Sequence, residues 1–142
     1  MTISDNYLDE GERTISNGVA FTAVSGLGGN GVNFTLTIKN NTIKRFPGNG
    51  IVADQNMLIN SIIFGNEVED NGLDGIYING GLNRGVFLFD NESEMNYRFD
   101  CHDDTTGSGT ANTGDYWSHN AGNLSQPSGL CTSGRRHDDD WR

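Results

Sequence analysis

Apolar residues are scarce in this sequence, and they form no long run. Hydrophobic residues make up 34% of the 142 residues, and no stretch approaches the roughly 18 consecutive apolar residues of a membrane-spanning helix. Apolar spacings of three and four are interrupted by Gly or Asn within about two helical turns. The sequence therefore predicts no membrane span and very little helix.

Basic residues are also scarce. Nine Lys and Arg residues stand against nineteen Asp and Glu residues, which gives a formal charge of -10. Such a charge repels phosphate backbones and anionic lipid, so nucleic acid is not expected as a partner. The opening MTISDNYLDEGER has neither the basic start nor the apolar stretch of a signal peptide. We expect either a cytosolic protein or a start that lies upstream of Met1.

Cysteine is limited to Cys101 and Cys131. This count fits either one disulfide or two buried thiols. A cysteine-based metal site would need more ligands at closer spacing, so none is predicted. Glycine, by contrast, occurs 20 times, and together with frequent Asn it indicates a chain with many turns.

Three columns of residues recur at a spacing of 25. The first holds Ile38, Ile63 and Leu88, the second Asn41, Asn66 and Asn91, and the third Gly50–Ile51, Gly75–Ile76 and Asp100–Cys101. A fainter copy precedes them at a spacing of 24, in which Asn17 anticipates Asn41 and Val19 anticipates Ile43. A constant period of this length indicates a solenoid.

Each period contains short alternating pieces such as FTLTI and GIYI, separated by Gly, Asn and Asp. Alternation is typical of strands with one buried face, and the separating residues tolerate the left-handed backbone of sharp corners. These features predict a β-solenoid. Ile51, Ile76 and Cys101 are predicted to stack inside it, and Val52, Tyr77 and His102 on its outer face. The Asn column is predicted to form a corner ladder of side-chain amides.

The pattern Asn-x-Val/Ile followed by Asn-Gly-x-x-Gly-Ile resembles the repeat of right-handed parallel β-helix proteins of the pectate-lyase-like superfamily. The segment DCHDDTTGSGTANTGDYWSHNAGNLSQPSGLC is similar to the closing segment of bacterial members. The resemblance covers about residues 34–131 and implies an all-β, right-handed, single-stranded parallel β-helix of about five rungs of roughly 25 residues. It further implies an extracellular or cell-surface protein that contacts or processes polysaccharide.

The predicted organisation has four parts. Residues 1–33 are expected to form a degenerate first rung or a truncated N-terminal edge, 34–104 the regular rungs, 105–131 an irregular final rung and cap, and 132–142 a disordered tail. The stack is short for this superfamily, so the chain resembles a C-terminal portion of a larger β-helix protein. We expect it to be a monomer.

The outer face of the GIYI strand is the candidate ligand-binding surface. Its predicted residues are Asp54, Tyr77, Asn79, His102 and Asp104. An aromatic ring beside carboxylates suits a sugar, because the ring can stack on a pyranose while the acids accept hydroxyl protons. The alternative is an ordinary solvated sheet face.

Calcium enters only through the resemblance, because lyases of this superfamily often use it to neutralise uronate carboxylates. Asp100, His102, Asp103 and Asp104 are the oxygen-rich cluster that invites this interpretation. Alternate residues of a strand point to opposite faces, so His102 and Asp104 can share a surface that Asp103 cannot. No calcium-loop pattern is present, and we predict no cofactor and no metal site.

No catalytic residue is singled out by the sequence. Arg45, Arg84 and Arg98 lie among polar residues near corners, and each could be a lyase base. Glu69 and Glu94 fall in one column, too close together for an inverting pair of carboxylates.

Two hypotheses of function therefore stand. The first is a lyase-like module that contacts or processes polysaccharide without a recognisable complete catalytic site. The second is a non-catalytic structural or adhesive β-helix, used for surface display as in tailspikes, or a truncated fragment of a larger protein. Cys101 takes the inward place of Ile51 and Ile76, and Cys131 could reach the rung beneath it, which favours a disulfide over two buried thiols.

Overall fold

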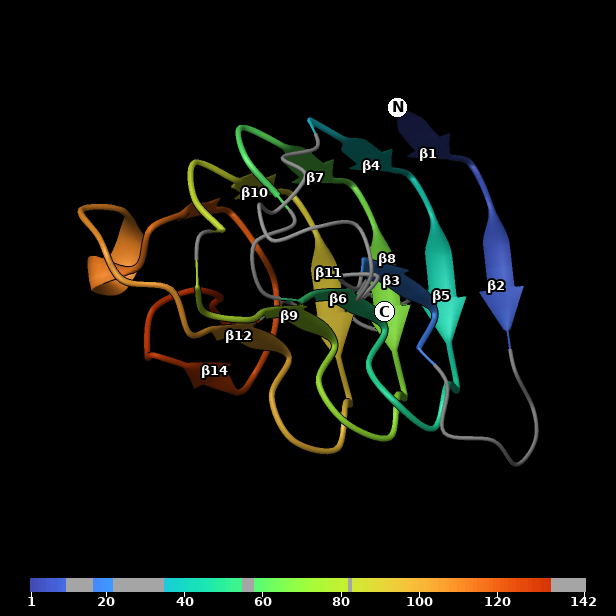
Figure 1. Ribbon diagram of the computed structural model, residues 1–142. Helices are drawn as coiled ribbons and strands as arrows, with labels where there is room; N and C mark the ends of the chain where they lie inside the picture. The colour runs from blue at the N-terminus through green and yellow to red at the C-terminus, as the bar shows by residue number, and fades with distance from the viewer. Residues whose placement is uncertain (10–16, 22–34, 55–57, 82, 134–142) are drawn as a thin grey trace.

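The computed structural model describes residues 1–9, 17–21, 35–54, 58–81 and 83–133. Short parallel strands form three sheets (Figure 1). The first contains β1 (Thr2–Ser4), β4 (Thr37–Lys39), β7 (Ile62–Phe64), β10 (Phe87–Phe89) and β13 (Tyr116–Ser118). The second contains β2 (Tyr7–Asp9), β5 (Thr42–Lys44), β8 (Glu67–Glu69) and β11 (Glu92–Glu94). The third contains β3 (Val19–Phe21), β6 (Ile51–Ala53), β9 (Ile76–Ile78), β12 (Cys101–Asp103) and β14 (Ser125–Gln126). One 3₁₀ turn, η1 (Thr110–Asn112), is the only helical element in these ranges.

The predicted fold class is confirmed, because every strand pairs in parallel with the strand of the next turn. Three turns, β4–β6, β7–β9 and β10–β12, keep the period of 25 residues, so that Ile38 pairs with Ile63 and Ile63 with Leu88. At the two ends, Ile3 pairs with Ile38 at a separation of 35, and Leu88 with Trp117 at a separation of 29. The expectation of about five rungs of roughly 25 residues is therefore an overcount, and about three turns have that length.

The alignment of the faint N-terminal copy is wrong. Val19 pairs with Ile51 in the third sheet, whereas Leu8 is the partner of Ile43 in the second. The first turn is longer than the later ones, since equivalent residues there are 35 rather than 25 apart. A fixed spacing of 24 therefore places Val19 against the wrong strand.

The core is a stack of aliphatic side chains inside the three sheets. In β4, β5, β7 and β8 the middle residue points inward, because neighbouring side chains of a strand alternate between its two faces. The fully buried members include Ile38, Ile43, Ile51, Ile63, Val68, Ile76, Leu88 and Cys101. The predicted inward stack of Ile51, Ile76 and Cys101 is confirmed, and burial of each large aliphatic side chain contributes about 2 kcal/mol.

The Asn column forms the predicted ladder at the corner between the first and second sheets. Asn41 Nδ2 donates to Asn66 Oδ1 at 3.0 Å, and Asn66 Nδ2 donates to Asn91 Oδ1 at 2.9 Å. Asn6 and Asn120 extend the ladder by one member at each end. The residues just before the five amides all have positive φ: Asp5, Asn40, Gly65, Asp90 and His119. The corner requires that conformation, which explains why Gly, Asn and Asp supply most of these positions.

The C-terminal end is closed by Trp117 and Leu130, which are both buried in the core cluster. The predicted tail, residues 132–142, lies almost wholly outside the described residues, as does much of the predicted first rung. Within the described ranges, no helix has the length and apolar character needed to cross a membrane.

Candidate functional site

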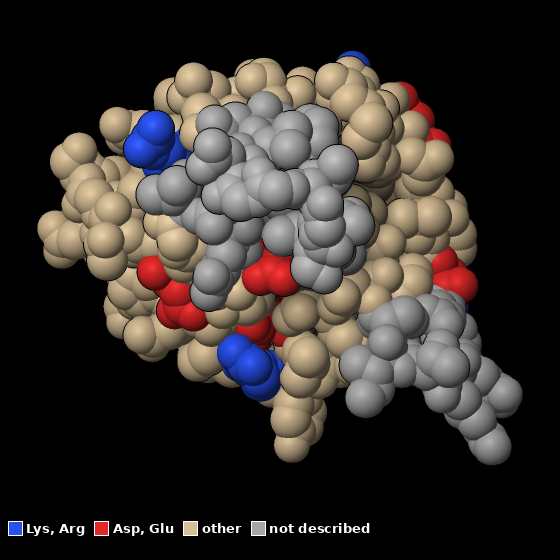
Figure 2. Space-filling model, viewed as in Figure 1, with Lys and Arg blue, Asp and Glu red and all other residues tan. Residues whose placement is uncertain are grey.

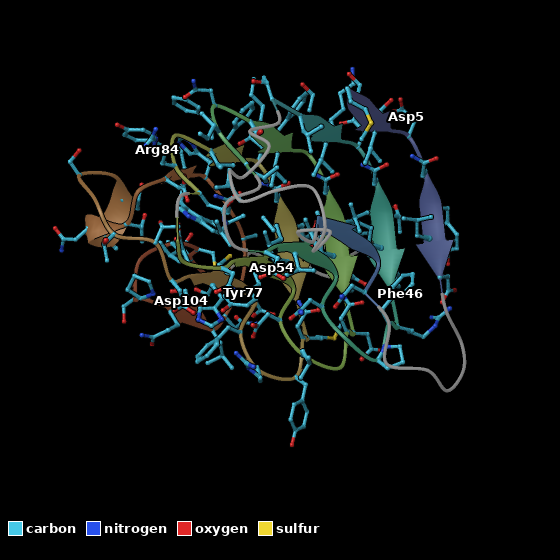
Figure 3. The ribbon with its side chains drawn as sticks, in the orientation of Figure 1. Asp5, Phe46, Asp54, Tyr77, Arg84 and Asp104 are labelled. Carbon is cyan, nitrogen blue, oxygen red and sulfur yellow. The ribbon has the colours of Figure 1, made fainter. Side chains whose placement is uncertain are left out.

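The five residues of the predicted ligand face come together on the outside of the third sheet. Val52, Tyr77 and His102 are register partners in β6, β9 and β12. Each is followed two residues later by a polar side chain on the same face, namely Asp54, Asn79 and Asp104. Figure 3 shows Asp54, Tyr77 and Asp104 in a row across these strands.

A hydrogen-bond network connects the polar members of this face. The Tyr77 hydroxyl lies 2.8 Å from Asp104 Oδ2 and 3.1 Å from Asn79 Oδ1. It has one hydrogen to donate, and the carboxylate is the stronger acceptor because it is charged. Asn79 Oδ1 also accepts the Gly80 N–H at 2.8 Å, and Asn79 Nδ2 donates to Asp54 Oδ1 at 2.9 Å. The side chains are thus held in fixed orientations.

His102 lies between two carboxylates. Its Nε2 is 3.1 Å from Asp104 Oδ1, and its Nδ1 is 2.9 Å from Asp74 Oδ2. Burial alone would lower the pKa of His102, but the hydrogen bonds and charges of Asp74 and Asp104 outweigh it and raise the pKa. The residue is only 6% exposed. Because both nitrogens are engaged, neither is available as a general base in this arrangement.

Asp74 is the residue of this site that the sequence analysis missed. It is fully buried, its Oδ1 accepts the Phe99 N–H at 3.1 Å, and its Oδ2 lies 3.1 Å from Arg98 Nη2. One turn earlier, Asn49 makes the equivalent bond to the Asp74 N–H at 3.0 Å. Asp74 stands 25 residues after Asn49, so a carboxylate in the place of that Asn, with Arg98 and His102 one turn later, was the available sequence signal.

Of the three arginines considered as a lyase base, Arg98 is the one at this face. Arg45 instead pairs with Asp9, and Arg84 stands apart from the labelled row in Figure 3. Glu69 pairs with Lys44 at 3.0 Å on the outside of the second sheet. A surface ion pair with Lys44 therefore explains the position of Glu69, one of the two residues of the glutamate column.

The ring of Tyr77 is not a free stacking platform. It stacks on the His102 ring with centroids 4.3 Å apart and an interplanar angle of 18°, and Phe99 meets the His102 ring edge-on at 5.0 Å. Val52, which is buried, is the Tyr77 partner in the preceding turn. A ligand therefore cannot stack on the side of the Tyr77 ring that faces His102. The Tyr77 hydroxyl is the group of this side chain that a ligand can contact. Burial and the bond to Asp104 raise the pKa of Tyr77, so the hydroxyl keeps its proton.

The acidic segment 100–104 does not converge on a cation. Asp103 points inward, as predicted from strand alternation, and accepts the Trp117 Nε1–H at 2.8 Å. Asp100 is buried and accepts N–H groups of Asn96 and Asn123. Among the described residues, no group of three or more His, Cys, Asp or Glu side chains is arranged to hold a metal ion. Asp100 and Asp103 are thus engaged by N–H donors of the protein and point in different directions.

The two cysteines lie away from this face, and the structure has no bond between their sulfur atoms. Cys101 is fully buried in the core, and Cys131 is half-buried. Burial raises the pKa of Cys101, and a hydrogen-bond contact with Cys131 raises it further. The thiols are therefore neighbours, and the disulfide remains a prediction.

The face can bind polar groups more readily than it can perform a reaction. The Asp104 side chain is 48% exposed, which makes it the carboxylate that a ligand can reach. Each of its oxygens accepts one hydrogen bond from the protein within the described ranges, and carboxylate oxygens have room for more. Figure 2 shows acidic side chains gathered on this side of the molecule.

The structure establishes a parallel β-solenoid with asparagine ladders. A scan against protein-family models, a search of curated proteins and a search of solved structures each found no significant match. The pectate-lyase-like relationship therefore has no support beyond the sequence pattern, and what is shown of this chain is its fold.

Proposed function

We propose that this chain is a β-solenoid module that contacts polysaccharide through the face of Tyr77, Asn79 and Asp104. The observation that carries the proposal is the exposed Asp104 carboxylate, held in place by Tyr77 and His102. Sugar hydroxyls bind such oriented acceptors, and a fixed network binds them without further loss of side-chain freedom. An extracellular location is part of the same proposal.

Binding is favoured over processing by the state of the ionisable groups. His102 has both nitrogens occupied, and Asp74 is buried against Arg98 and His102. A proton-transfer group needs an open position within hydrogen-bond reach of the substrate. With His102 engaged on both sides, we propose a contact surface without lyase activity.

A structural or adhesive role is the second candidate, and the ladder favours it. Five stacked asparagines along one corner make the turns regular and rigid. In that role the solenoid acts as a spacer or a display element, and the polar face is only its solvated surface.

Affinity electrophoresis in gels that contain neutral, acidic or amino polysaccharides tests the proposal. The wild-type chain should be retarded by at least one polymer. Tyr77→Phe and Asp104→Asn should each reduce that retardation several-fold, because each removes a group of the network. Asp70→Asn is the matched control, since it makes the same charge change at an exposed corner away from this face.

Two results would decide against this function. Absence of retardation by every polymer would remove polysaccharide contact and leave the structural role. Equal retardation of all three variants would place the contact elsewhere on the solenoid. Ultraviolet absorbance after incubation with uronate polymers and calcium should stay flat, whereas a rise would establish lyase activity.

A further inference from the structure

The edge formed by β1 and β2 is an open end of the solenoid. These strands are the terminal members of the first and second sheets, and Figure 1 shows them at one end of the stack. Their inward residues, Ile3 and Leu8, are only partly buried, whereas their register partners Ile38 and Ile43 are fully buried. The apolar stack thus ends there without a covering layer among the described residues.

One backbone donor of β2 points outward at this edge, on the side away from β5. In later turns the residue after each ladder asparagine donates its N–H to the asparagine carbonyl of the preceding turn. Thr42 N donates to Asn6 O at 2.8 Å, and Glu67 N donates to Asn41 O at 2.9 Å. Tyr7 occupies the same position in the first turn, and its N–H has no partner in the described part of the chain.

The first sheet repeats this arrangement. Ile62 N donates to Leu36 O at 2.8 Å, and Thr37 N donates to Met1 O at 3.0 Å. Thr2 is the register partner of Thr37, and no residue that the structure describes accepts its N–H. Two parallel N–H donors, those of Thr2 and Tyr7, are therefore presented at one edge.

The asparagine ladder is also unfinished at this end. Asn41 Oδ1 accepts both the N–H and the Nδ2–H of Asn6, at 3.1 and 3.0 Å. Asn66 Oδ1 accepts the same pair from Asn41, both at 3.0 Å. Asn6 Oδ1 accepts no such pair of N–H and Nδ2–H bonds from any described residue. Asn6 is also exposed, whereas Asn41 and Asn66 are each only 1% exposed.

We propose that the β1–β2 edge binds a parallel strand–corner–strand segment of another protein, with an asparagine at the corner. The segment's asparagine donates its N–H and Nδ2–H to Asn6 Oδ1, and its carbonyl accepts the Tyr7 N–H. The carbonyl five residues earlier accepts the Thr2 N–H. Apolar residues three before and two after that asparagine cover Ile3 and Leu8, which makes this a form of strand addition.

A second copy of this chain does not fit the edge. Two copies related by a two-fold axis would bring Asn6 Oδ1 against Asn6 Oδ1, and both atoms are acceptors. Head-to-tail stacking would need the Asn120 carbonyl, which already accepts the Thr132 N–H at 3.0 Å, and Asn120 is buried. The proposed segment therefore does not come from a second copy of this chain, and this inference is independent of polysaccharide binding.

The probe is a labelled peptide that copies residues 35–45, TLTIKNNTIKR. It carries Ile38, Asn41 and Ile43 at the required spacings. In the solenoid, its Leu36 and Asn41 carbonyls accept the N–H groups of the following turn. Fluorescence anisotropy should show saturable binding to the full chain. A peptide with Asn41→Ala should bind about fivefold more weakly, and its identical charge removes electrostatic attraction as an explanation.

Two further measurements locate the complex. Asn6→Ala should weaken binding of the original peptide more than binding of the Asn41→Ala peptide. The original peptide loses both its N–H and its Nδ2–H bond to Asn6 Oδ1, whereas the Asn41→Ala peptide has only the N–H bond to lose. Asn6 is exposed, so circular dichroism should show an intact fold. Hydrogen exchange at the Thr2 and Tyr7 amides should slow on peptide addition. No saturable binding, equal affinity of the two peptides, or unchanged exchange at these amides would each overturn the proposal.

Discussion

Replacement of Asp115 by Asn should stabilise the protein at neutral pH. Asp115 is fully buried, its Oδ1 accepts the Val86 N–H at 2.9 Å, and its Oδ2 lies 3.2 Å from Thr105 Oγ1. The same hydroxyl lies 2.5 Å from Asp103 Oδ1. A threonine hydroxyl has one hydrogen, so it can satisfy only one of the two carboxylates.

Asp103 is the carboxylate with the better set of donors. It also accepts the Thr105 N–H at 2.9 Å and the Trp117 Nε1–H at 2.8 Å. Asp115 therefore favours its protonated form, in which it donates to Thr105 Oγ1. Burial raises the pKa of Asp115 to about 6; the Val86 N–H opposes this, and the charge of Asp103 adds to it. A move from 3.8 to about 6 corresponds to about 3 kcal/mol.

The sign of the pH dependence follows from the raised pKa. The folded protein holds the Asp115 proton more tightly than the unfolded chain, so protonation stabilises the fold. This contribution is complete below pH 3.8 and is lost as the pH rises through about 6. The amide of the Asp115→Asn variant would not ionise, and its Nδ2–H would replace the carboxylic acid proton toward Thr105.

Urea unfolding of the wild type and Asp115→Asn between pH 4 and pH 8 measures this effect. The variant should match the wild type near pH 4 and exceed it above pH 6 by up to about 3 kcal/mol. Subtraction of the two curves cancels every other titrating group. Asp103→Asn is the control, because an amide there would turn a donor toward the N–H groups of Thr105 or Trp117 and destabilise the fold at every pH.

Two outcomes would refute the hydrogen-bond count. If Asp115→Asn is less stable than the wild type at pH 7, the carboxylate is ionised and is satisfied there. If the difference between the two proteins does not change with pH, Asp115 does not titrate between the folded and unfolded values. Either result would contradict the inference that the Thr105 hydroxyl donates its hydrogen to Asp103 and leaves Asp115 protonated.

Three other predictions concern the ladder, the polar face and the core. Asn66→Ala should cost at least about 3 kcal/mol in urea unfolding, because it leaves several buried ladder donors and acceptors unpaired; a loss below about 1 kcal/mol would contradict the ladder's role. Because the pKa of His102 is raised in the folded protein, its pairing with Asp74 stabilises the fold in full below pH 6.5, and this stabilisation is lost as the pH rises through the raised pKa. His102→Gln should abolish that dependence, and an unchanged pH profile would show that the pair contributes nothing. Mild oxidation should protect both Cys101 and Cys131 from alkylation, and Cys131→Ser should leave Cys101 unlinked; continued alkylation of both thiols would exclude the disulfide.

The candidate site was predictable where it follows the strand rule. Tyr77 and His102 fall at one place in the period, and Asn79 and Asp104 lie two residues further on, so alternation put all four on one face. Asp74 was missed, and Arg98 was named only as one of three possible lyase bases, because both residues come from corners, where no alternation holds. Their part in the site depends on the approach of two neighbouring turns.

The N-terminal turn shows the same limit in another form. The columns of Ile38, Asn41 and Ile51 align correctly because their turns share one length. Val19 is misaligned because the first turn differs in length from these turns. A constant sequence period identifies equivalent residues only in turns of that same length.

The sequence by itself determined the solenoid, its inward columns and its asparagine ladder, because periodicity and alternation are properties of the chain alone. Only the tertiary structure decided the number of regular turns, the stacking of the Tyr77 ring on His102, and the burial of Asp74 and Asp115. These features depend on contacts between turns of unequal length and on the competition of several groups for one hydrogen. Such contacts exist only once the turns are stacked.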